Sequence, residues 1–146
     1  MKTSDLEKIL KTKLKEIGFT KQGPTWHRKK EIVIQVINIQ KSSWSDLFFI
    51  NLGVYLTPIG NTDKPKENHC HLRRRLSSLV KNIEEFNKTV DYTENNNIDE
   101  GLLEYIEGEA LQWLESCSTI DGLITELNST ETLITLNARE YIEKEA

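Results

Sequence analysis

The sequence predicts an α+β fold in which an N-terminal helix, an antiparallel sheet of about four strands and C-terminal helices follow one another. Apolar residues recur at helical spacing near the N-terminus, two long apolar segments have the composition of strands, and helical spacing returns in the second half. The 146 residues fit a single domain, 1–146, with its own core. No segment approaches the roughly 20 apolar residues of a membrane span, so we expect no membrane partner.

The first expected helix begins with a capping box, in which Ser4 is the N-cap and the carboxylate of Glu7 reaches back to it. Gly18 suits a left-handed helix end, and Phe19 is expected to pack back on the helix. The apolar stripe between these ends consists of Leu6, Ile9, Leu10, Leu14 and Ile17.

Three strands are expected next, at residues 25–29, 32–41 and 48–56, joined by turns near Lys30 and at 42–46. They predict an antiparallel meander, and residues 58–68 read as an exposed loop. Side chains alternate along a strand, so one face of the third strand should meet the core and the first helix. That face carries Phe48, Ile50, Leu52, Val54 and Leu56.

Residues 69–76 are compatible with a strand or with a helix start, and we predict a fourth strand to about Leu76. A short helix through Phe86 should follow it. A stronger helical pattern runs from about Ile98 to Ser116, with an apolar stripe on one side and six acidic residues at 99–115.

The C-terminal end of the chain predicts two further helical pieces. Either Ser118 or Thr119 is the expected N-cap of the first. The last helical piece is expected to contain Leu133, Ile134, Tyr141 and Ile142.

Polar residues interrupt the two apolar strands, and two interpretations of them compete. In the structural interpretation Asn38 and Gln40 hydrogen-bond the backbone of the 42–46 turn, and Gly53 lets an aromatic ring such as Trp26 lie flat on the sheet. In the functional interpretation a shared groove binds a ligand. We favour the structural one, because buried amides usually find local partners. The candidate ligand-binding residues of the groove are Trp26, Gln40, Asn51, His71, Arg73 and Arg75.

Charge is divided unevenly along the chain. Residues 1–75 hold 15 Lys/Arg and 7 Asp/Glu, a net charge of +8, whereas residues 76–146 hold 4 and 16, a net charge of −12. We favour mutual attraction of the two halves over nucleic-acid binding, and we expect Arg73 and Arg75 to pair with the acidic helices. Binding of a single strand, with Trp26 and Trp44 as stacking platforms, is the less favoured alternative.

The sequence has no recognisable catalytic motif, so the catalytic residues stay unknown and we lean against an enzyme. Cys70 lies between two histidines, but neighbours on a strand point to opposite faces and cannot easily form a dyad. His69 and His71 could share a face, yet zinc needs three or four ligands. We therefore expect no metal and no cofactor. Two cysteines and a charged N-terminus without a signal-peptide core favour the cytoplasm.

Several sequence blocks resemble a known family. The blocks are Gly18-Phe19, Gly23-Pro24-Thr25-Trp26-His27-Arg28, Val36-Ile37-Asn38-Ile39-Gln40-Lys41-Ser42, Phe48-Phe49-Ile50-Asn51-Leu52-Gly53-Val54 and Cys70-His71-Leu72-Arg73-Arg74-Arg75-Leu76. In order and spacing they resemble the bacterial domain-of-unknown-function 4304 family over about residues 5–80. The resemblance implies a compact α+β domain of the bacterial cytoplasm, and it implies no reaction, substrate or cofactor.

These observations favour a non-catalytic module that binds another protein, with an immunity-like role as one form of that function. The sheet face or the acidic helical flank would be the binding surface. The first alternative is an enzyme that binds a small ligand or nucleotide in the Trp/His/Arg groove. The second is a binder of single-stranded nucleic acid, which the acidic pI of about 5.5 makes unlikely.

Overall fold

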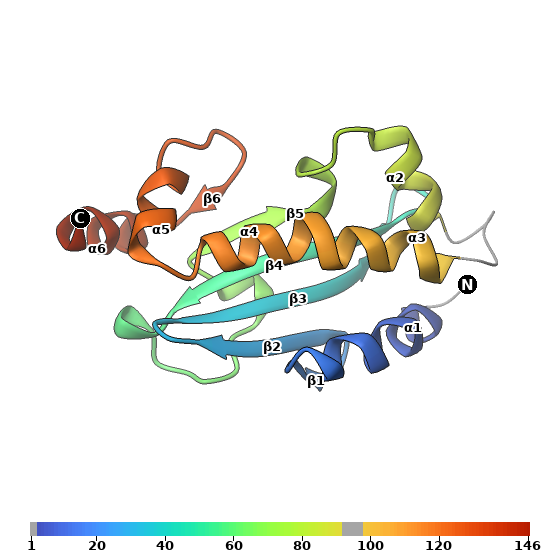
Figure 1. Ribbon diagram of the computed structural model, residues 1–146, viewed down its shortest axis with the longest axis horizontal. Helices are drawn as coiled ribbons and strands as arrows, with labels where there is room; N and C mark the ends of the chain where they lie inside the picture. The colour runs from blue at the N-terminus through green and yellow to red at the C-terminus, as the bar shows by residue number, and fades with distance from the viewer. Residues whose placement is uncertain (1–2, 92–97) are drawn as a thin grey trace.

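A computed structural model describes residues 3–91 and 98–146. It contains a six-stranded sheet in the order β1-β2-β3-β4-β5-β6, in which each strand is antiparallel to the next (Figure 1). The α+β class and the antiparallel sheet are confirmed, but the sheet has six strands rather than about four. The two further strands are short ones at the edges. The strands are β1 (Thr20–Gln22), β2 (Thr25–Lys30), β3 (Val33–Lys41), β4 (Phe48–Leu56), β5 (Leu72–Arg75) and β6 (Leu133–Ile134).

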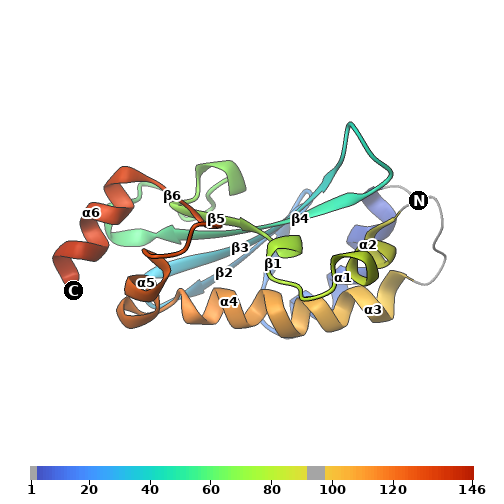
Figure 2. The same cartoon turned by 90° about the horizontal axis from the view of Figure 1, so that it is seen from above.

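Helices cover one face of this sheet. The helix α1 (Thr3–Glu16) and a long rod pack against it, and the rod runs along one side of the sheet in Figure 2. The rod consists of α3 (Ile98–Tyr105), the π-helical segment η4 (Ile106–Ala110) and α4 (Leu111–Ser116), which confirms the helix predicted over these residues. None of the helices in the described ranges has the length and apolar character of a membrane span.

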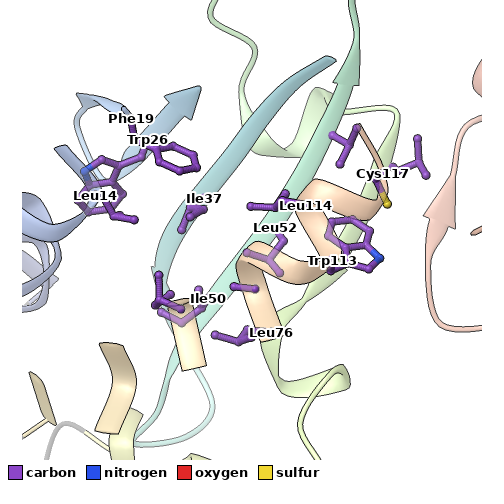
Figure 3. Close-up of a cluster of buried hydrophobic side chains, with 14 of the residues drawn as sticks. Leu14, Phe19, Trp26, Ile37, Ile50, Leu52, Leu76, Trp113, Leu114 and Cys117 are labelled. Atoms are coloured by element: carbon purple, nitrogen blue, oxygen red, sulfur yellow. The ribbon is translucent and has the colours of Figure 1, made fainter. Parts of the chain in front are cut away.

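The core lies between the sheet and these helices. All five predicted core-facing side chains of β4, from Phe48 to Leu56, are buried there. Figure 3 shows Ile37 and Leu52 of the sheet close to Leu114 of the rod. Full burial of such a side chain contributes about 1.5–3 kcal/mol. The strict alternation of apolar residues along β4 therefore fixes which face of the sheet meets the helices.

The end of α1 follows the sequence prediction. Gly18 has φ +99°, and the N–H of Phe19 donates to the carbonyl of Leu14 at 2.9 Å, which closes the helix. The predicted capping box at the start of α1 depends on the Ser4 side chain, which lies outside the described part of the chain. Glu7 forms an ion pair with Lys21 at 2.8 Å.

The fourth strand is confirmed as β5, and the 3-10 turn η3 (Leu76–Ser78) follows it. The next helix, α2 (Ile83–Val90), begins later than predicted and ends beyond Phe86. Thr119 is the N-cap of α5 (Ile120–Glu126), where its hydroxyl accepts a hydrogen bond from the N–H of Gly122 at 3.2 Å.

The expectation of a helix at Leu133 and Ile134 is wrong. These residues form β6, which pairs with β5 so that Ile134 lies opposite Leu72. The final helix, α6 (Leu136–Glu145), begins after them with Thr135 as its N-cap. Backbone groups at a sheet edge need partners, and this need outweighs the helical spacing of two apolar residues.

The two oppositely charged halves are joined by ion pairs. Of the seven ion pairs among the described residues, five connect residues 1–75 with residues 76–146. The buried amide of Gln35 adds to this contact, since its Nε2 donates to Ser118 Oγ at 3.0 Å. Attraction between the halves, predicted from the charge division, is thus part of the tertiary packing. The five pairs are Lys13–Glu107, Arg28–Glu115, Lys30–Glu115, Arg74–Glu126 and Arg74–Glu131.

Candidate functional site

The face of the sheet opposite the helices has a covered part and an open part. The segment 57–71 lies over one part, where it buries a small cluster of Ile34, Val36, Tyr55 and Cys70. Figure 2 shows this segment on the side of the sheet away from the rod, and the β3–β4 hairpin bending away from the rod as well. The remaining part, which we call the open face, carries Asn38, Gln40, Phe49, Asn51, Arg73 and Arg75.

Three amides form a connected network on the open face. Asn51 is buried, and its Nδ2 donates to Asn38 Oδ1 and to Gln40 Oε1, each at 3.0 Å. Asn38 Nδ2 in turn donates to Thr25 Oγ1 at 2.9 Å, so the network links β2, β3 and β4. These hydrogen bonds offset the free-energy cost of burying the Asn51 amide, and they fix its position.

The structural interpretation of these amides is right about local bonding and wrong about the partner. Asn38 and Gln40 bond the Asn51 amide rather than the 42–46 turn. That turn is held by Ser42, whose Oγ accepts hydrogen bonds from the N–H groups of Trp44 and Ser45 at 3.1 Å. Asn38 lies directly opposite Asn51 in the β3–β4 register, which brings their side chains together.

Two arginines of β5 stand on the open face beside the amides. Arg73 donates from Nε and Nη2 to the two carboxylate oxygens of Glu67, at 3.1 and 3.2 Å. The guanidinium of Arg75 lies 3.8 Å from the centre of the Phe49 ring. This is a cation–π contact, and the ring holds the guanidinium against the sheet.

The expectation that Arg73 and Arg75 pair with the acidic helices is wrong. Alternation along β5 turns both of them away from the helix layer, and Glu67 belongs to the 3-10 turn η2 (Glu67–His69) of the covering segment. The arginine between them faces the other way. Arg74 contacts Glu126 at 3.7 Å and Glu131 at 3.0 Å.

Two adjoining hollows lie on the open face, with volumes of about 400 and 420 Å³. Gln40, Asn51, Glu67 and Arg73 border both. The first extends to Arg75, Ser77 and Leu133, and the second to Thr25, Lys66 and Asn68. The hollows present arginine, lysine and amide hydrogen-bond donors together with the carboxylates of Glu67 and Glu131, and Arg75 connects them to the Phe49 ring.

Four of the six candidate residues therefore meet on the open face: Gln40, Asn51, Arg73 and Arg75. Trp26 does not join them. It lies on the opposite face of β2, is 1% exposed, and packs beside Leu14 and Phe19 (Figure 3). The residue that crosses Gly53 is Cys70 rather than Trp26, because a Cβ at Gly53 would lie 2.6 Å from the Cys70 Sγ.

His71 is also separated from the hollows. Its imidazole is buried, its Nδ1 accepts a hydrogen bond from the Leu56 N–H at 2.8 Å, and its ring lies 4.6 Å from the ring of Tyr55. Burial lowers the pKa of His71, which favours this neutral acceptor form. The imidazole thus ties β5 to the end of β4.

The other side chains that could act as nucleophiles or metal ligands, those of the cysteines and of His27, also make contacts inside the fold. Burial raises the pKa of the Cys70 thiol, and it raises that of Cys117 to about 12, so neither is a thiolate at neutral pH. His27 Nε2 donates to the carbonyl of Pro65 at 2.7 Å. In the described ranges no three His, Cys, Asp or Glu side chains gather as a metal site, and His69 lies in η2 rather than on a strand with His71.

Sequence reasoning missed Phe49, Lys66 and Glu67. The alternation of β4 already placed Phe49 on the same face as Asn51, so that signal was present. Glu67 and Lys66 come from a segment that reads as an exposed loop, and no local pattern connects them with Arg73. A further hollow of about 730 Å³ lies elsewhere, beside Thr20, Lys29 and Lys64.

The model of one family, described as "Domain of unknown function (DUF4304)", matches residues 10–116. This range includes every residue of the open face, and it extends well past the blocks quoted from the sequence. Residues 117–146, with α5, β6 and α6, lie outside the match. Comparison with curated proteins and with solved structures gave no match.

Proposed function

The chain belongs to the DUF4304 family, and from this premise we propose that it is a non-catalytic module that binds another protein through the open face. One observation carries the proposal. The open face presents a fixed array of amides, arginines and an aromatic ring to the solvent, whereas the thiols and the imidazoles of His27 and His71 are engaged inside the fold.

The array has the chemistry of protein interfaces. Arginine and aromatic side chains dominate the binding energy of many interfaces, and the open face carries Arg75 on Phe49. Trp44, in the connection between β3 and β4, is 96% exposed and adds a second aromatic near this end of the sheet. Because Asn51 and Arg73 are already held by neighbours, a partner would order few side chains on binding.

The sheet-face version of the proposal is better supported than the acidic-flank version. Glu107 is paired with Lys13 at 3.0 Å, and Glu115 with Arg28 at 2.5 Å. These carboxylates of the rod already serve contacts within the chain. They would have to be released before they could attract a basic partner.

The alternatives have less support. An enzyme with a Trp/His/Arg groove lacks two of its groups, because Trp26 and His71 are buried away from the arginines. Binding of a nucleic-acid single strand loses Trp26 as a stacking platform and keeps Trp44 alone. As parts of the same proposal, we place the module in the bacterial cytoplasm and assign it an immunity-like role, in which the bound partner is a toxin.

The proposal is tested by capture with matched baits. The wild-type chain and the Phe49→Ala variant are used to capture a partner, which is then purified and titrated calorimetrically against each bait. We expect Phe49→Ala to weaken binding at least tenfold, equivalent to about 1.4 kcal/mol. Ile83→Ala, which shortens an exposed apolar side chain of α2, is the control and should bind like the wild type. Equal binding by all three baits would remove the open face as the docking surface.

A further inference from the structure

We propose that the open face accepts an acidic, extended segment of the partner protein, whose carboxylates bind Arg75 and Lys66. This inference rests on the proposed function and names the chemistry of the partner. It follows from the distribution of charge around the two hollows, from the fixed geometry of Arg75 and from the spacing of side chains on β5.

Charge on the open face is only partly neutralised by the chain itself. Among the residues that line the hollows, the carboxylate of Glu67 pairs with Arg73 and that of Glu131 pairs with Arg74. Arg75 and Lys66 form no ion pair with any residue in the described ranges. The hollows therefore carry two uncompensated positive charges, one at each side of the fixed Arg73–Glu67 pair, and an acidic segment complements them.

Arg75 is arranged to receive a carboxylate. Its guanidinium lies over the Phe49 ring at 3.8 Å, so one flat side is covered, and the residue as a whole is exposed. A planar guanidinium held in this way can donate two parallel hydrogen bonds to one carboxylate. The ring also reduces the side-chain entropy that Arg75 would lose on binding.

The neighbouring groups favour an extended segment. Arg73 and Arg75 are alternate residues of one strand, which places them about 6.4–6.8 Å apart along it. Side chains that point the same way from an extended partner have the same spacing. Arg73 Nη1 takes no part in the two bonds to Glu67. Within the described chain, Gln40 uses its Oε1 and leaves its Nε2 without a hydrogen bond.

The rest of the molecule disfavours a long polyanion as the occupant. The net charge of the chain is −4, and the carboxylates of Glu67 and Glu131 border the hollows. A long nucleic-acid strand would bring many phosphates to a chain of negative net charge, whereas a short acidic segment ends within the open face. Repulsion of this kind costs affinity in proportion to the number of like charges approached.

The test uses short synthetic peptides of alternating composition: Glu-Thr, the uncharged match Gln-Thr, and Lys-Thr. Binding to the full chain is followed by fluorescence anisotropy at low and at raised salt. We expect the Glu-Thr peptide to bind at least tenfold more tightly than Gln-Thr, with salt weakening only the former. The variants Arg75→Gln and Lys66→Gln should each lose most of this preference, and Lys29→Gln, on the same side of the sheet but outside the open face, should keep it.

Three results would overturn the inference. They are equal binding of the Glu-Thr and Gln-Thr peptides, no binding of the Glu-Thr peptide, and binding of an oligothymidylate as tight as that of the Glu-Thr peptide. If the captured partner still depends on Phe49 when the peptides fail, the protein-binding function stands and only the acidic segment is lost. Thermal melting of each variant confirms that it is folded.

Discussion

His71 connects two strands through a single imidazole nitrogen. Nδ1 accepts the hydrogen bond of the Leu56 N–H, so a proton on Nδ1 would remove the bond and set two donors against each other. Burial lowers the pKa of His71 below its usual 6.5. In the unfolded chain the imidazole therefore binds a proton at a higher pH than in the folded chain.

From this we predict a loss of stability in mild acid. The contribution of His71 is fully present above pH 6.5, the ordinary value, and is lost as the pH falls through the lower pKa of the folded state. Urea unfolding at a series of pH values should show the free energy of unfolding declining below about pH 6.5, with a smaller decline in His71→Gln. His69→Gln, at an exposed position, should decline like the wild type. The same slope in all three chains would contradict the prediction.

Gly53 shows a different constraint at the residue scale, because Cys70 crosses it closely. A Cβ at this position would lie 2.6 Å from Cys70 Sγ and 2.9 Å from Cys70 Cβ. Such overpacking typically costs about 1–3 kcal/mol. We expect Gly53→Ala to destabilise the chain by about this amount.

A double-mutant cycle with Cys70→Ala isolates this contact. Removal of the sulfur should recover part of the loss in Gly53→Ala, measured as the free energy of unfolding in urea. Gly108→Ala is the matched control: a Cβ there meets nothing within 4 Å, and alanine favours the helix. Strict additivity of the two substitutions would show that Cys70 is not the obstacle.

At the scale of elements, Arg74 attaches the C-terminal segment to the sheet. Its Nε donates to Ser78 Oγ at 2.7 Å, and its Nη2 donates to Glu131 Oε2 at 3.0 Å. Glu126, which also accepts from Trp113 Nε1 at 3.0 Å, lies 3.7 Å from Arg74 Nη1. Through the side chain of Arg74, β5 thus binds both α5 and the segment that leads to β6.

We predict that Arg74→Ala destabilises the chain by about 2 kcal/mol, because the largely buried guanidinium loses its hydrogen bonds to Ser78 and the largely buried Glu126 carboxylate loses its cationic neighbour. Hydrogen exchange should become faster in α5 and β6, while β2 and β3 stay protected. Arg75→Ala, one residue along the same strand, should have little effect on stability, since that side chain is exposed. Equal losses in the two variants would show that Arg74 has no special role in holding this segment.

For the whole molecule, the two cysteines lie on opposite sides of the sheet, so their reactivity measures the exposure of each side. Cys117 belongs to the main core beside the helices, and Cys70 belongs to the cluster under the covering segment. Both thiols are buried and protonated at neutral pH, so a disulfide reagent should reach neither in the native chain.

We predict that both thiols react slowly with a disulfide reagent in native buffer and rapidly in guanidinium chloride. The ion pairs between the two halves favour joint unfolding of the chain. In that case both thiols should react at the same rate when unfolding limits the rate of the reaction. Mass spectrometry of the partly reacted chain measures each site separately. Faster reaction of Cys117 alone would show that the C-terminal half opens independently.

Elements whose patterns are local could be predicted from the sequence. The apolar stripe of α1, its glycine end, the alternation of β4 and the long helix over 98–116 all follow from periodicity within one segment. Half of the candidate site could be predicted in the same way. Alternation along each strand places Phe49 on the same face as Asn51, and Arg73 on the same face as Arg75.

Which segments contact one another depends on the tertiary fold and could not be predicted from local patterns. The pairing of Arg73 with Glu67, the burial of Trp26 on the far face, and the addition of β1 and β6 to the sheet edges depend on register and on the path of the chain. These contacts join residues that no short window contains. Side-chain periodicity sets the direction of a residue relative to its own element, whereas its partner is set by whichever distant segment satisfies the charges and backbone groups left exposed.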